Sequence, residues 1–309
     1  MDHRIKNEGV RRSVKRWMPL FILPAFISFL ISFVWPFILG LYLSFCDFNI
    51  PRDAKWAGLK NYLSAFSDPS FGRAFMNTLL FAVASIAVIN IPAFFIAYFL
   101  SGKFRGVKLF RTAFFLPNLI GGVVLGYLWS MIFDGILDFF GTYLTADPVF
   151  GFWGLVILVA WQQIGYMMII YIAGFQSVPT DMLEAADIDG VTGAQKLFRI
   201  ILPNMIPTIS ICVFLTLTNG FKMFDQNLAL TAGAPIDTLE NGMQVRTTEL
   251  IALNIYNTYN INRNWHGTAQ AKAVVFFVLV GAFALLQQYL TNRDNDAPRR
   301  SRKKGGAAE

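Results

Sequence analysis

The chain alternates between long apolar segments and short polar ones, and this pattern indicates its architecture. A bilayer-spanning helix needs about 20 mostly apolar residues, and six segments of the 309-residue chain meet that test. They cover roughly 17–46, 75–100, 109–133, 152–175, 205–223 and 273–290. The pattern therefore predicts an all-α integral membrane protein with six transmembrane helices.

The composition supports a chain that is surrounded by lipid. Hydrophobic residues make up 55% of the chain and charged residues only 15%, whereas a soluble domain holds about a quarter charged residues. The net charge of +7 comes from short basic segments beside apolar runs, which is how membrane proteins distribute lysine and arginine. We therefore expect membrane lipid as a partner and no nucleic acid.

The basic segments also predict an orientation. Lysine and arginine gather at 1–16, at 103–111 and at 293–304, whereas the loop after the third apolar segment carries Asp134 and Asp138 without a basic residue. Because basic loops stay in the cytoplasm, we expect both termini to be cytoplasmic. An even number of spans agrees with this arrangement.

The same pattern divides the chain into three parts. Residues 1–16 form a basic cytoplasmic N-terminus, 17–292 form the membrane domain, and the polar tail at 293–309 is expected to be disordered. The longest expected external loops are 47–74 and 224–272, and the first of these should lie along the membrane interface as a short helix.

One cytoplasmic segment, at 177–203, is charged although apolar runs flank it; its residues 182–203 read MLEAADIDGVTGAQKLFRIILP. Pro179 suits the first turn of a helix, and Gly190 can reverse the chain with a positive φ. Thr192 is a candidate cap for a second short helix, which Pro203 should end. Small Ala185 and Ala186 would let another surface approach closely. An amphipathic helix pair with exposed apolar side chains favours a partner.

This segment resembles the EAA motif of permeases from binding-protein-dependent ABC importers. The resemblance implies a type I, maltose-permease-like bundle of six transmembrane helices, with a cytoplasmic coupling helix that binds the ATP-hydrolysing subunit. It also implies a location in the bacterial plasma membrane. The positions that match the motif, and are expected to couple to the ATPase, are Glu184, Ala185, Ala186, Asp189, Gly190, Phe198 and Pro203.

Further matches cover nearly the whole chain and resemble the carbohydrate-uptake branch of this family. They include WAGLKNY at 56–62, FLPNLIGGVVLGYLWSMIF at 115–133 and FDQNLALTAGAP at 224–235. The chain departs from the family at the entrance to its last span, where Thr268, Gln270 and Lys272 are more polar than usual. That departure leaves any role of the outer mouth in specificity open.

Polar residues inside spans are costly and tend to face a cavity or another helix. Two spans flank the charged segment, and their polar positions recur at helical spacing, together with an aromatic ring. Amides, a hydroxyl and aromatic rings suit a sugar, and in the resembled family these two helices line the transport path. The predicted pathway residues are Trp161, Gln162, Tyr166, Thr216, Asn219, Gly220 and Met223.

No catalytic or metal-binding motif accompanies these features. The sequence holds no phosphate-binding GxxxxGK[ST] loop, and its two cysteines and two histidines match no metal spacing. We therefore expect a transport subunit that is not an enzyme and has no cofactor of its own. The resemblance implies that partner ATPase subunits bind ATP and Mg²⁺, that a second homologous permease completes the path, and that an extracellular solute-binding protein delivers the sugar.

Three alternatives stay open. An ABC permease for glycerol phosphate or another polyol would want basic groups along the path, where only Lys222 and Lys272 are near. A secondary transporter without ATP would want carboxylates deep in the spans, and the central parts of the spans hold none. An integral-membrane enzyme would want clustered histidines or carboxylates at one membrane face. The residues favour a neutral oligosaccharide importer without identifying the sugar, and they do not decide whether the second permease is a distinct chain or another copy.

Overall fold

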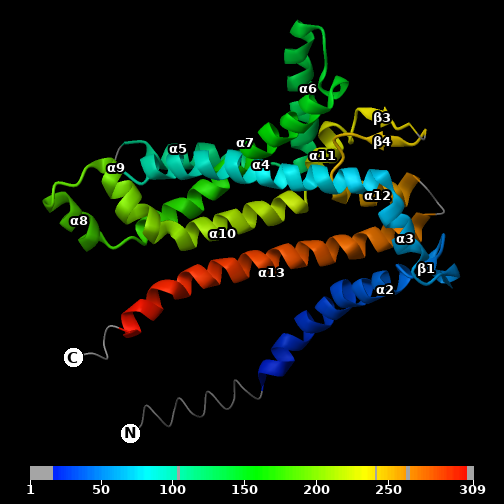
Figure 1. The fold of residues 1–309 in the computed structure, drawn as a ribbon, viewed down its shortest axis with the longest axis horizontal. Helices are drawn as coiled ribbons and strands as arrows, with labels where there is room; N and C mark the ends of the chain where they lie inside the picture. The colour runs from blue at the N-terminus through cyan, green and yellow to red at the C-terminus, as the bar shows by residue number, and fades with distance from the viewer. Residues whose placement is uncertain (1–16, 103–104, 241, 262–264, 305–309) are drawn as a thin grey trace. The chain divides into compact units, whose positions relative to one another are not determined.

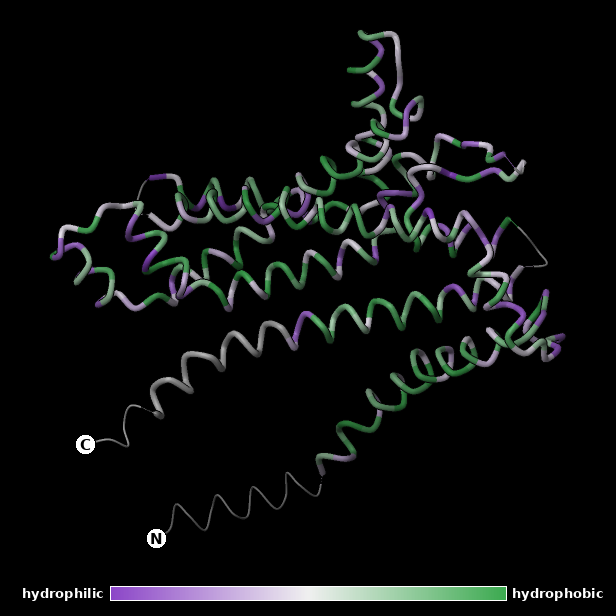
Figure 2. The backbone as a smooth tube through the Cα atoms, viewed as in Figure 1, coloured by the Kyte–Doolittle hydropathy of each residue, from purple (hydrophilic) through white to green (hydrophobic). Residues whose placement is uncertain are grey.

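The protein is almost entirely helical in a computed structural model that describes residues 17–102, 105–240, 242–261 and 265–304, with side chains as far as 289. Six described helices are long and apolar enough to cross a membrane, which is the number that the sequence predicted. Figure 2 shows that hydrophobic residues predominate along these helices. The spans are Trp17–Leu43, Pro69–Leu100, Gly122–Phe140, Pro148–Gln176, Gly193–Phe221 and His266–Tyr289.

The chain forms two compact units, of which the larger comprises residues 66–257 and 275–309. Its centre is built from α4 (Pro69–Leu100), α7 (Pro148–Gln176) and α10 (Leu202–Phe221), which pack against one another (Figure 1). The two longest begin in the same way. Asp68 and Asp147 each accept a hydrogen bond from a backbone amide of the first turn, and a proline follows each of them.

Small residues allow these helices to approach closely, as is common where apolar side chains face lipid rather than water. Gly220 of α10 faces Ala82 of α4, and a Cβ on Gly220 would lie 3.2 Å from the Ala82 Cα. Gly165 of α7 approaches the helix that contains Phe114 even more closely, because any Cβ on Gly165 would clash with the Phe114 carbonyl. Buried apolar side chains such as Phe81 and Met167 fill the rest of this core.

The third predicted span, at 109–133, is wrong in its boundaries. The structure has α5 (Val107–Phe115), a short 3-10 turn η3 (Leu116–Leu119) and then α6 (Gly122–Leu137). Backbone at Ile120 and Gly121 is extended, and Pro117 lacks an amide to continue the helix. The apolar residues before the break therefore belong to α5, which packs along α7, and the span itself begins at Gly122.

The fifth span also begins earlier than predicted, because Pro203 does not end a helix. Helix α9 (Gly193–Lys196) continues through a π-turn, η6 (Leu197–Ile201), into α10 without a loop. A proline in a helix clashes with the carbonyl four residues before it, which here belongs to Arg199. The wider π-turn at that point accommodates Pro203 at the start of α10.

Polar side chains hold together the segment that follows α10. Helix α11 (Asp225–Leu230) packs on α6, and α12 (Ile251–Ile261) follows a hairpin of β3 (Ile236–Thr238) and β4 (Gln244–Arg246), in which Asp237 pairs with Val245. Buried Asn227 donates to the Thr248 carbonyl and accepts from the Leu250 amide. These bonds fix the hairpin to α11.

The smaller unit comprises residues 1–65 and 258–274. Helical residues 17–29 lead into η1 (Leu30–Val34) and α2 (Trp35–Leu43), followed by the short antiparallel strands β1 (Cys46–Asp47) and β2 (Lys55–Trp56) with the turn η2 (Pro51–Asp53) between them. Helix α3 (Lys60–Ser67) lies in the loop where the sequence predicted a short helix.

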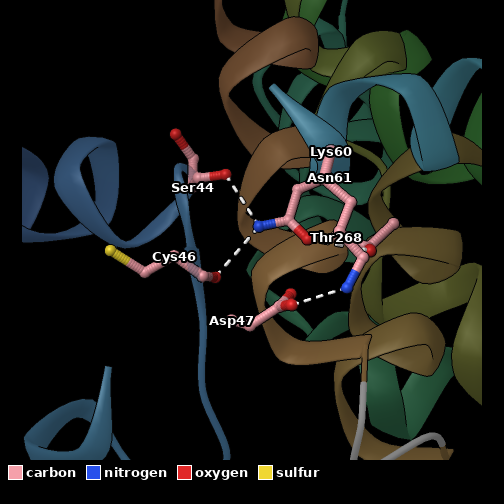
Figure 3. Close-up of polar contacts among 6 residues, drawn as sticks. All are labelled: Ser44, Cys46, Asp47, Lys60, Asn61 and Thr268. Atoms are coloured by element: carbon pink, nitrogen blue, oxygen red, sulfur yellow. Dashed lines mark hydrogen bonds and ion pairs between the residues drawn. The ribbon is translucent and has the colours of Figure 1, made fainter. Parts of the chain in front are cut away.

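Asn61 of α3 holds this unit together (Figure 3). Its Nδ2 donates to the carbonyls of Ser44, at 3.0 Å, and Cys46, at 2.9 Å, while its Oδ1 accepts from the Thr268 hydroxyl at 3.5 Å. Beside it, Lys60 Nζ lies 2.6 Å from Asp47 Oδ2. The first span, α3 and the start of the last helix are therefore joined through one buried amide.

The last helix, α13 (His266–Lys304), includes most of the tail that the sequence predicted to be disordered. Residues 290–304 contain no glycine, and their arginines and lysines favour a helix, whereas their asparagines, aspartates and Pro298 oppose it. The basic N-terminus at 1–16 and the last five tail residues, 305–309, lie outside the described residues.

Candidate functional site: coupling segment and transport path

The charged segment forms a helix, a turn and a second helix start, as its sequence predicted. Helix α8 (Thr180–Ile188) begins after Pro179, and Gly190 reverses the chain with a φ of 68°. Thr192 then caps α9 in a reciprocal arrangement, in which its hydroxyl accepts from the Gln195 amide and the Gln195 side chain accepts from the Thr192 amide. The turn geometry is therefore specified locally.

An ion pair that the sequence analysis did not foresee closes this turn. Lys196 Nζ lies 2.7 Å from Asp187 Oδ1 and 2.8 Å from Oδ2, so that α9 is tied to the end of α8. The Lys196 side chain is 21% exposed and that of Asp187 is 65% exposed. Such a pair contributes at most about 1 kcal/mol, and its effect is mainly to fix the angle between the two helices.

Most residues of the EAA motif face outward from this segment. Ala186 is the exception, because its side chain is buried. Of the two alanines, only Ala185 therefore offers a small exposed side chain. The exposed positions are Glu184, Ala185, Asp189, Gly190, Phe198 and Pro203.

Two exposed apolar side chains beside the motif were not predicted as site residues. Ile188 is 86% exposed at the end of α8, and Met182 is 44% exposed one helical turn before Ala186. Exposed carboxylates beside exposed apolar groups form a surface that suits a protein partner. Ile188 lies two residues after the buried Ala186 and therefore on the opposite face of α8. The sequence could have indicated its exposure only if the bounds of α8 had been known.

The predicted pathway residues of α10 come together at a narrow crevice between α4, α7 and α10. Thr216, Asn219 and Gly220 share one face of α10 and line it, together with Met223 just beyond the end of that helix. The crevice has about 180 Å³ of empty volume and no room for a water-sized sphere. The crevice is thus a closed, partly polar contact between helices rather than an open channel.

On α7 the crevice is lined by Gln163, which the sequence analysis did not choose. Asn219 Nδ2 lies 3.3 Å from Gln163 Oε1 and donates to it. From α4 comes Ser85, whose hydroxyl oxygen is buried without a hydrogen-bond partner among the described residues. Amides and hydroxyls from three helices therefore meet at this crevice, and no charged group lines it.

The three pathway residues predicted on α7 lie elsewhere. Gln162 is buried, donates to the Ile120 carbonyl at 3.1 Å and accepts from Gln226 Nε2 at 2.8 Å. It therefore connects α7 to the break before α6 and to α11. Trp161 is 43% exposed and its ring lies 5.5 Å from that of Trp129. Tyr166 is half-buried and does not line the crevice.

A buried hydrogen-bonded group adjoins the crevice. The Tyr171 hydroxyl donates to Asn90 Oδ1 at 2.9 Å, and Asn90 Nδ2 donates to Thr216 Oγ1 at 3.0 Å and to the Ile86 carbonyl at 3.0 Å. Thr216 in turn donates to the Cys212 carbonyl. Every polar atom of this group has a partner, so that it links α4, α7 and α10 within the apolar core.

The polar residues at the entrance of the last span point into the smaller unit. Thr268 and Lys272 are buried, and Lys272 Nζ donates to Thr258 Oγ1 at 2.7 Å. Gln270 is half-buried, and its Oε1 lies 3.3 Å from where a Cβ on Gly40 would be. The departure from the family pattern therefore has a local packing role in this unit.

Known proteins with similar sequences place the chain in a family. A family model described as "Binding-protein-dependent transport system inner membrane component" matches residues 93–294. The chain is 40% identical to the probable starch degradation products transport system permease protein AmyD of Thermoanaerobacterium thermosulfurigenes, over 90% of this chain and 94% of the relative. It is 28% identical to the multiple sugar-binding transport system permease protein MsmF of Streptococcus mutans, over 90% and 96%.

A solved structure has the same fold. A chain of the bacterial alginate ABC transporter, in complex with an alginate pentasaccharide-bound periplasmic protein, superimposes with a TM-score of 0.75 at 22% identity. The match covers 91% of this chain and 96% of that one. With the family model spanning most of the chain and six apolar helices in the fold, this protein belongs to the family of inner-membrane permease components of binding-protein-dependent ABC transport systems.

Proposed function

We propose that this chain is the permease subunit of an ABC importer that moves a neutral oligosaccharide across the bacterial plasma membrane. The observation that carries the proposal is the position of α8. This exposed helix follows α7 in the sequence and is joined to α10 through α9 and η6, and α7 and α10 hold the Gln163–Asn219 contact at the crevice. A partner that moves α8 therefore acts on both walls of the candidate path.

The energy comes from separate ATPase subunits, which bind ATP and Mg²⁺. Their binding surface is the exposed part of the charged segment at 177–203, here called the coupling segment, with the Glu184 carboxylate, the small Ala185 and the apolar Ile188. Closure of the ATPase pair on ATP draws the coupling segments together and opens the path outward, and hydrolysis returns the path to the inward-facing state. This is alternating access between two arrangements of packed helices.

A second permease completes the path, because the crevice of this chain is too narrow for a sugar ring. In this proposal α7 and α10 supply one wall, and the corresponding helices of a homologous chain supply the other. The two termini lie in the cytoplasm, in agreement with the basic segments. An extracellular solute-binding protein docks on the loops at 47–74 and 224–272; the presence of a periplasmic protein in the alginate complex supports such a partner.

The neutral oligosaccharide is favoured by the chemistry of the crevice. Gln163, Asn219 and Ser85 offer amide and hydroxyl groups, which pair with sugar hydroxyls, and no cation lines the crevice to bind a phosphate. The names of the relatives AmyD and MsmF, which refer to starch degradation products and multiple sugars, agree with this choice.

Isolation of the tagged chain from mild detergent tests the proposal, followed by reconstitution of whatever purifies with it. We expect an ATPase with a phosphate-binding loop and a second six-span permease, and uptake of malto-type oligosaccharides into liposomes that requires ATP and the binding protein. A chain that purifies alone and moves solute without ATP would overturn the importer. ATP-dependent uptake of glycerol phosphate, with no uptake of oligosaccharide, would overturn the substrate class alone.

A further inference from the structure

A second cavity lies outside the candidate path, on the other side of the buried Asn90–Tyr171–Thr216 group. Its volume is about 450 Å³, and its lining is almost wholly apolar. Residues of α4 such as Ile91 and Phe95 form one side, and Leu202, Ile209 and Val213 of α10 form the other. We call this cavity the α4–α10 groove. It is partly open at the surface of membrane-spanning helices, so that its natural surroundings are hydrocarbon.

The floor of the groove offers nothing to a polar ligand. Asn90 and Tyr171 are its only polar side chains. The Tyr171 hydroxyl and both polar ends of the Asn90 amide are engaged in the hydrogen bonds described above. A sugar hydroxyl would find no unpaired donor or acceptor there, and would lose its own hydration. The groove therefore suits an apolar occupant.

The dimensions distinguish a hydrocarbon chain from a helix. From Leu202 to Val213 the groove follows α10 for about 16 Å, at 1.5 Å per residue. Even all of its empty space, about 950 Å³, corresponds over that length to a mean cross-section of at most about 60 Å². A helix about 10 Å across has a cross-section of about 80 Å², so that only the tips of its side chains would enter. A single flexible acyl chain can fill the groove along its length.

Cations lie at one end of the groove. Asn90 faces Thr216 and Ala82 faces Gly220, so that α4 and α10 run antiparallel, and Phe95 and Leu202 lie toward the same end. Arg199, between the lining residues Phe198 and Leu202, is exposed and has no ion pair or side-chain hydrogen bond within the described part of the chain.

A second cation lies beyond the same end of α4. Arg111 Nη2 donates to the Leu100 carbonyl at 2.8 Å, and the Nε atom of this guanidinium is buried without a partner among the described residues. Two basic side chains therefore lie toward the end of the groove where an acyl chain would continue into its headgroup. Basic residues at the membrane surface attract anionic headgroups.

We propose that the α4–α10 groove binds one acyl chain of an anionic phospholipid, whose phosphate lies against Arg199. The lipid belongs to the leaflet on the side of the coupling segment. Its acyl chain lies between Phe198 at the π-turn η6 and Phe95 of α4, and so fills space beside the junction of the coupling segment with α10. The site goes beyond the proposed transport function, because lipid binding requires neither the ATPase nor a sugar.

Photolabelling of the full chain in lipid vesicles tests this proposal. The purified chain is reconstituted in vesicles of phosphatidylethanolamine and phosphatidylglycerol, with a trace of phosphatidylglycerol that carries a diazirine on one acyl chain. After illumination, labelled peptides are identified by mass spectrometry. We expect label to concentrate on residues 86–95 and 202–213, above the general labelling of lipid-facing helices.

A matched pair of variants separates the groove from the rest of α10. Ile209→Trp fills the groove, whereas Ile206→Trp places the same ring on an exposed position of the same helix that does not line it. Labelling of 86–95 should fall in Ile209→Trp and persist in Ile206→Trp. Equal labelling in both, or label spread evenly over all spans, would overturn the site. So would a cysteine at 209 that cross-links to a second permease in the assembled importer.

The headgroup is tested separately, with a variant that leaves the groove intact. Arg199→Gln should reduce the preference for labelled phosphatidylglycerol over labelled phosphatidylcholine by about fivefold, whereas Arg199→Lys should retain most of it. An unchanged preference in Arg199→Gln would overturn the anionic lipid even if the groove is labelled. These readouts are independent of uptake, so that failure of the importer and failure of the lipid site are distinguishable.

Discussion

Gln163 of α7 and Asn219 of α10 face each other across the closed crevice, with 3.3 Å between Asn219 Nδ2 and Gln163 Oε1. Neither amide is charged, and the nearby Ser85 hydroxyl is buried without a partner among the described residues. In a lipid-embedded bundle such polar groups are retained at a cost. Because the two amides lie on the helices that flank the coupling segment, we expect them to act in transport, and this can be measured.

Substitution of Asn219 by leucine should impair uptake without weakening the ATPase complex. The change removes one amide from the crevice, and a lost hydrogen bond of about 1 kcal/mol raises the KM for uptake about fivefold. Thr218→Val is the control, since Thr218 bonds only to carbonyls of its own helix. Unaltered uptake kinetics in Asn219→Leu would assign Asn219 to helix packing.

Reversal of charge at Glu184 tests the coupling segment. Glu184 is exposed on α8, so that Glu184→Lys should leave folding and membrane insertion intact while it reduces co-purification of the ATPase and abolishes most uptake. Glu240→Lys makes the same charge change at an exposed position in the β3–β4 loop and should retain the ATPase. Normal uptake by Glu184→Lys at normal expression would remove this residue from the coupling surface.

The turn after α8 depends on a left-handed residue. Gly190 has a φ of 68°, with open space around it, so that Gly190→Ala costs about 1–2 kcal/mol through its backbone alone. We expect the altered turn to separate Lys196 from Asp187 and to reduce ATP-dependent uptake. Gly190→Asn should restore part of the activity, because asparagine tolerates this conformation better.

Gly193→Ala serves as the control for that turn, since Gly193 lies in α9 with nothing near its Cβ position. Its uptake should match that of the parent chain. If Gly190→Ala transports as well as Gly193→Ala does, then the shape of the turn has no part in coupling.

Close packing of α5 on α7 predicts a large effect on stability from one methyl group. A Cβ on Gly165 would clash with the Phe114 carbonyl, so that Gly165→Ala should destabilise the chain by about 1–3 kcal/mol. Gly135→Ala in α6 meets no atom within 4 Å and should leave the thermal unfolding temperature in detergent unchanged or slightly higher. Equal unfolding temperatures for the two variants would contradict the close approach of α5.

The sequence predicted the number of spans because apolar length is a local property. It did not predict the break at 116–121, since Pro117 and the glycines at 121 and 122 hardly lower the hydropathy of the run. The continuous path through η6 was missed for the opposite reason. Pro203 is a strong signal for a helix end, and only the π-turn before it shows how the helix continues.

The candidate site was predicted in part, for a geometrical reason. One face of α10 carries Thr216, Asn219 and Gly220, Met223 follows just beyond its end, and spacing alone brings these together. On α7 two glutamines are adjacent, and neighbouring helical residues point about 100° apart. The sequence offered no means to decide that Gln163 faces the crevice while Gln162 bonds to Ile120 and Gln226.

The unbroken passage from α9 through η6 into α10 makes the two connections of the coupling segment mechanically unequal. On one side, α7 ends at Gln176 and reaches α8 through a bend at Ser177 and Pro179, which can absorb rotation. On the other side one continuous helix extends from Gly193 past Asn219, over about 39 Å, and it contains the π-turn η6 and Pro207. We therefore expect a displacement at the segment to reach Asn219 more directly than Gln163, which follows through the bend, so that the two amides of the crevice move by different amounts.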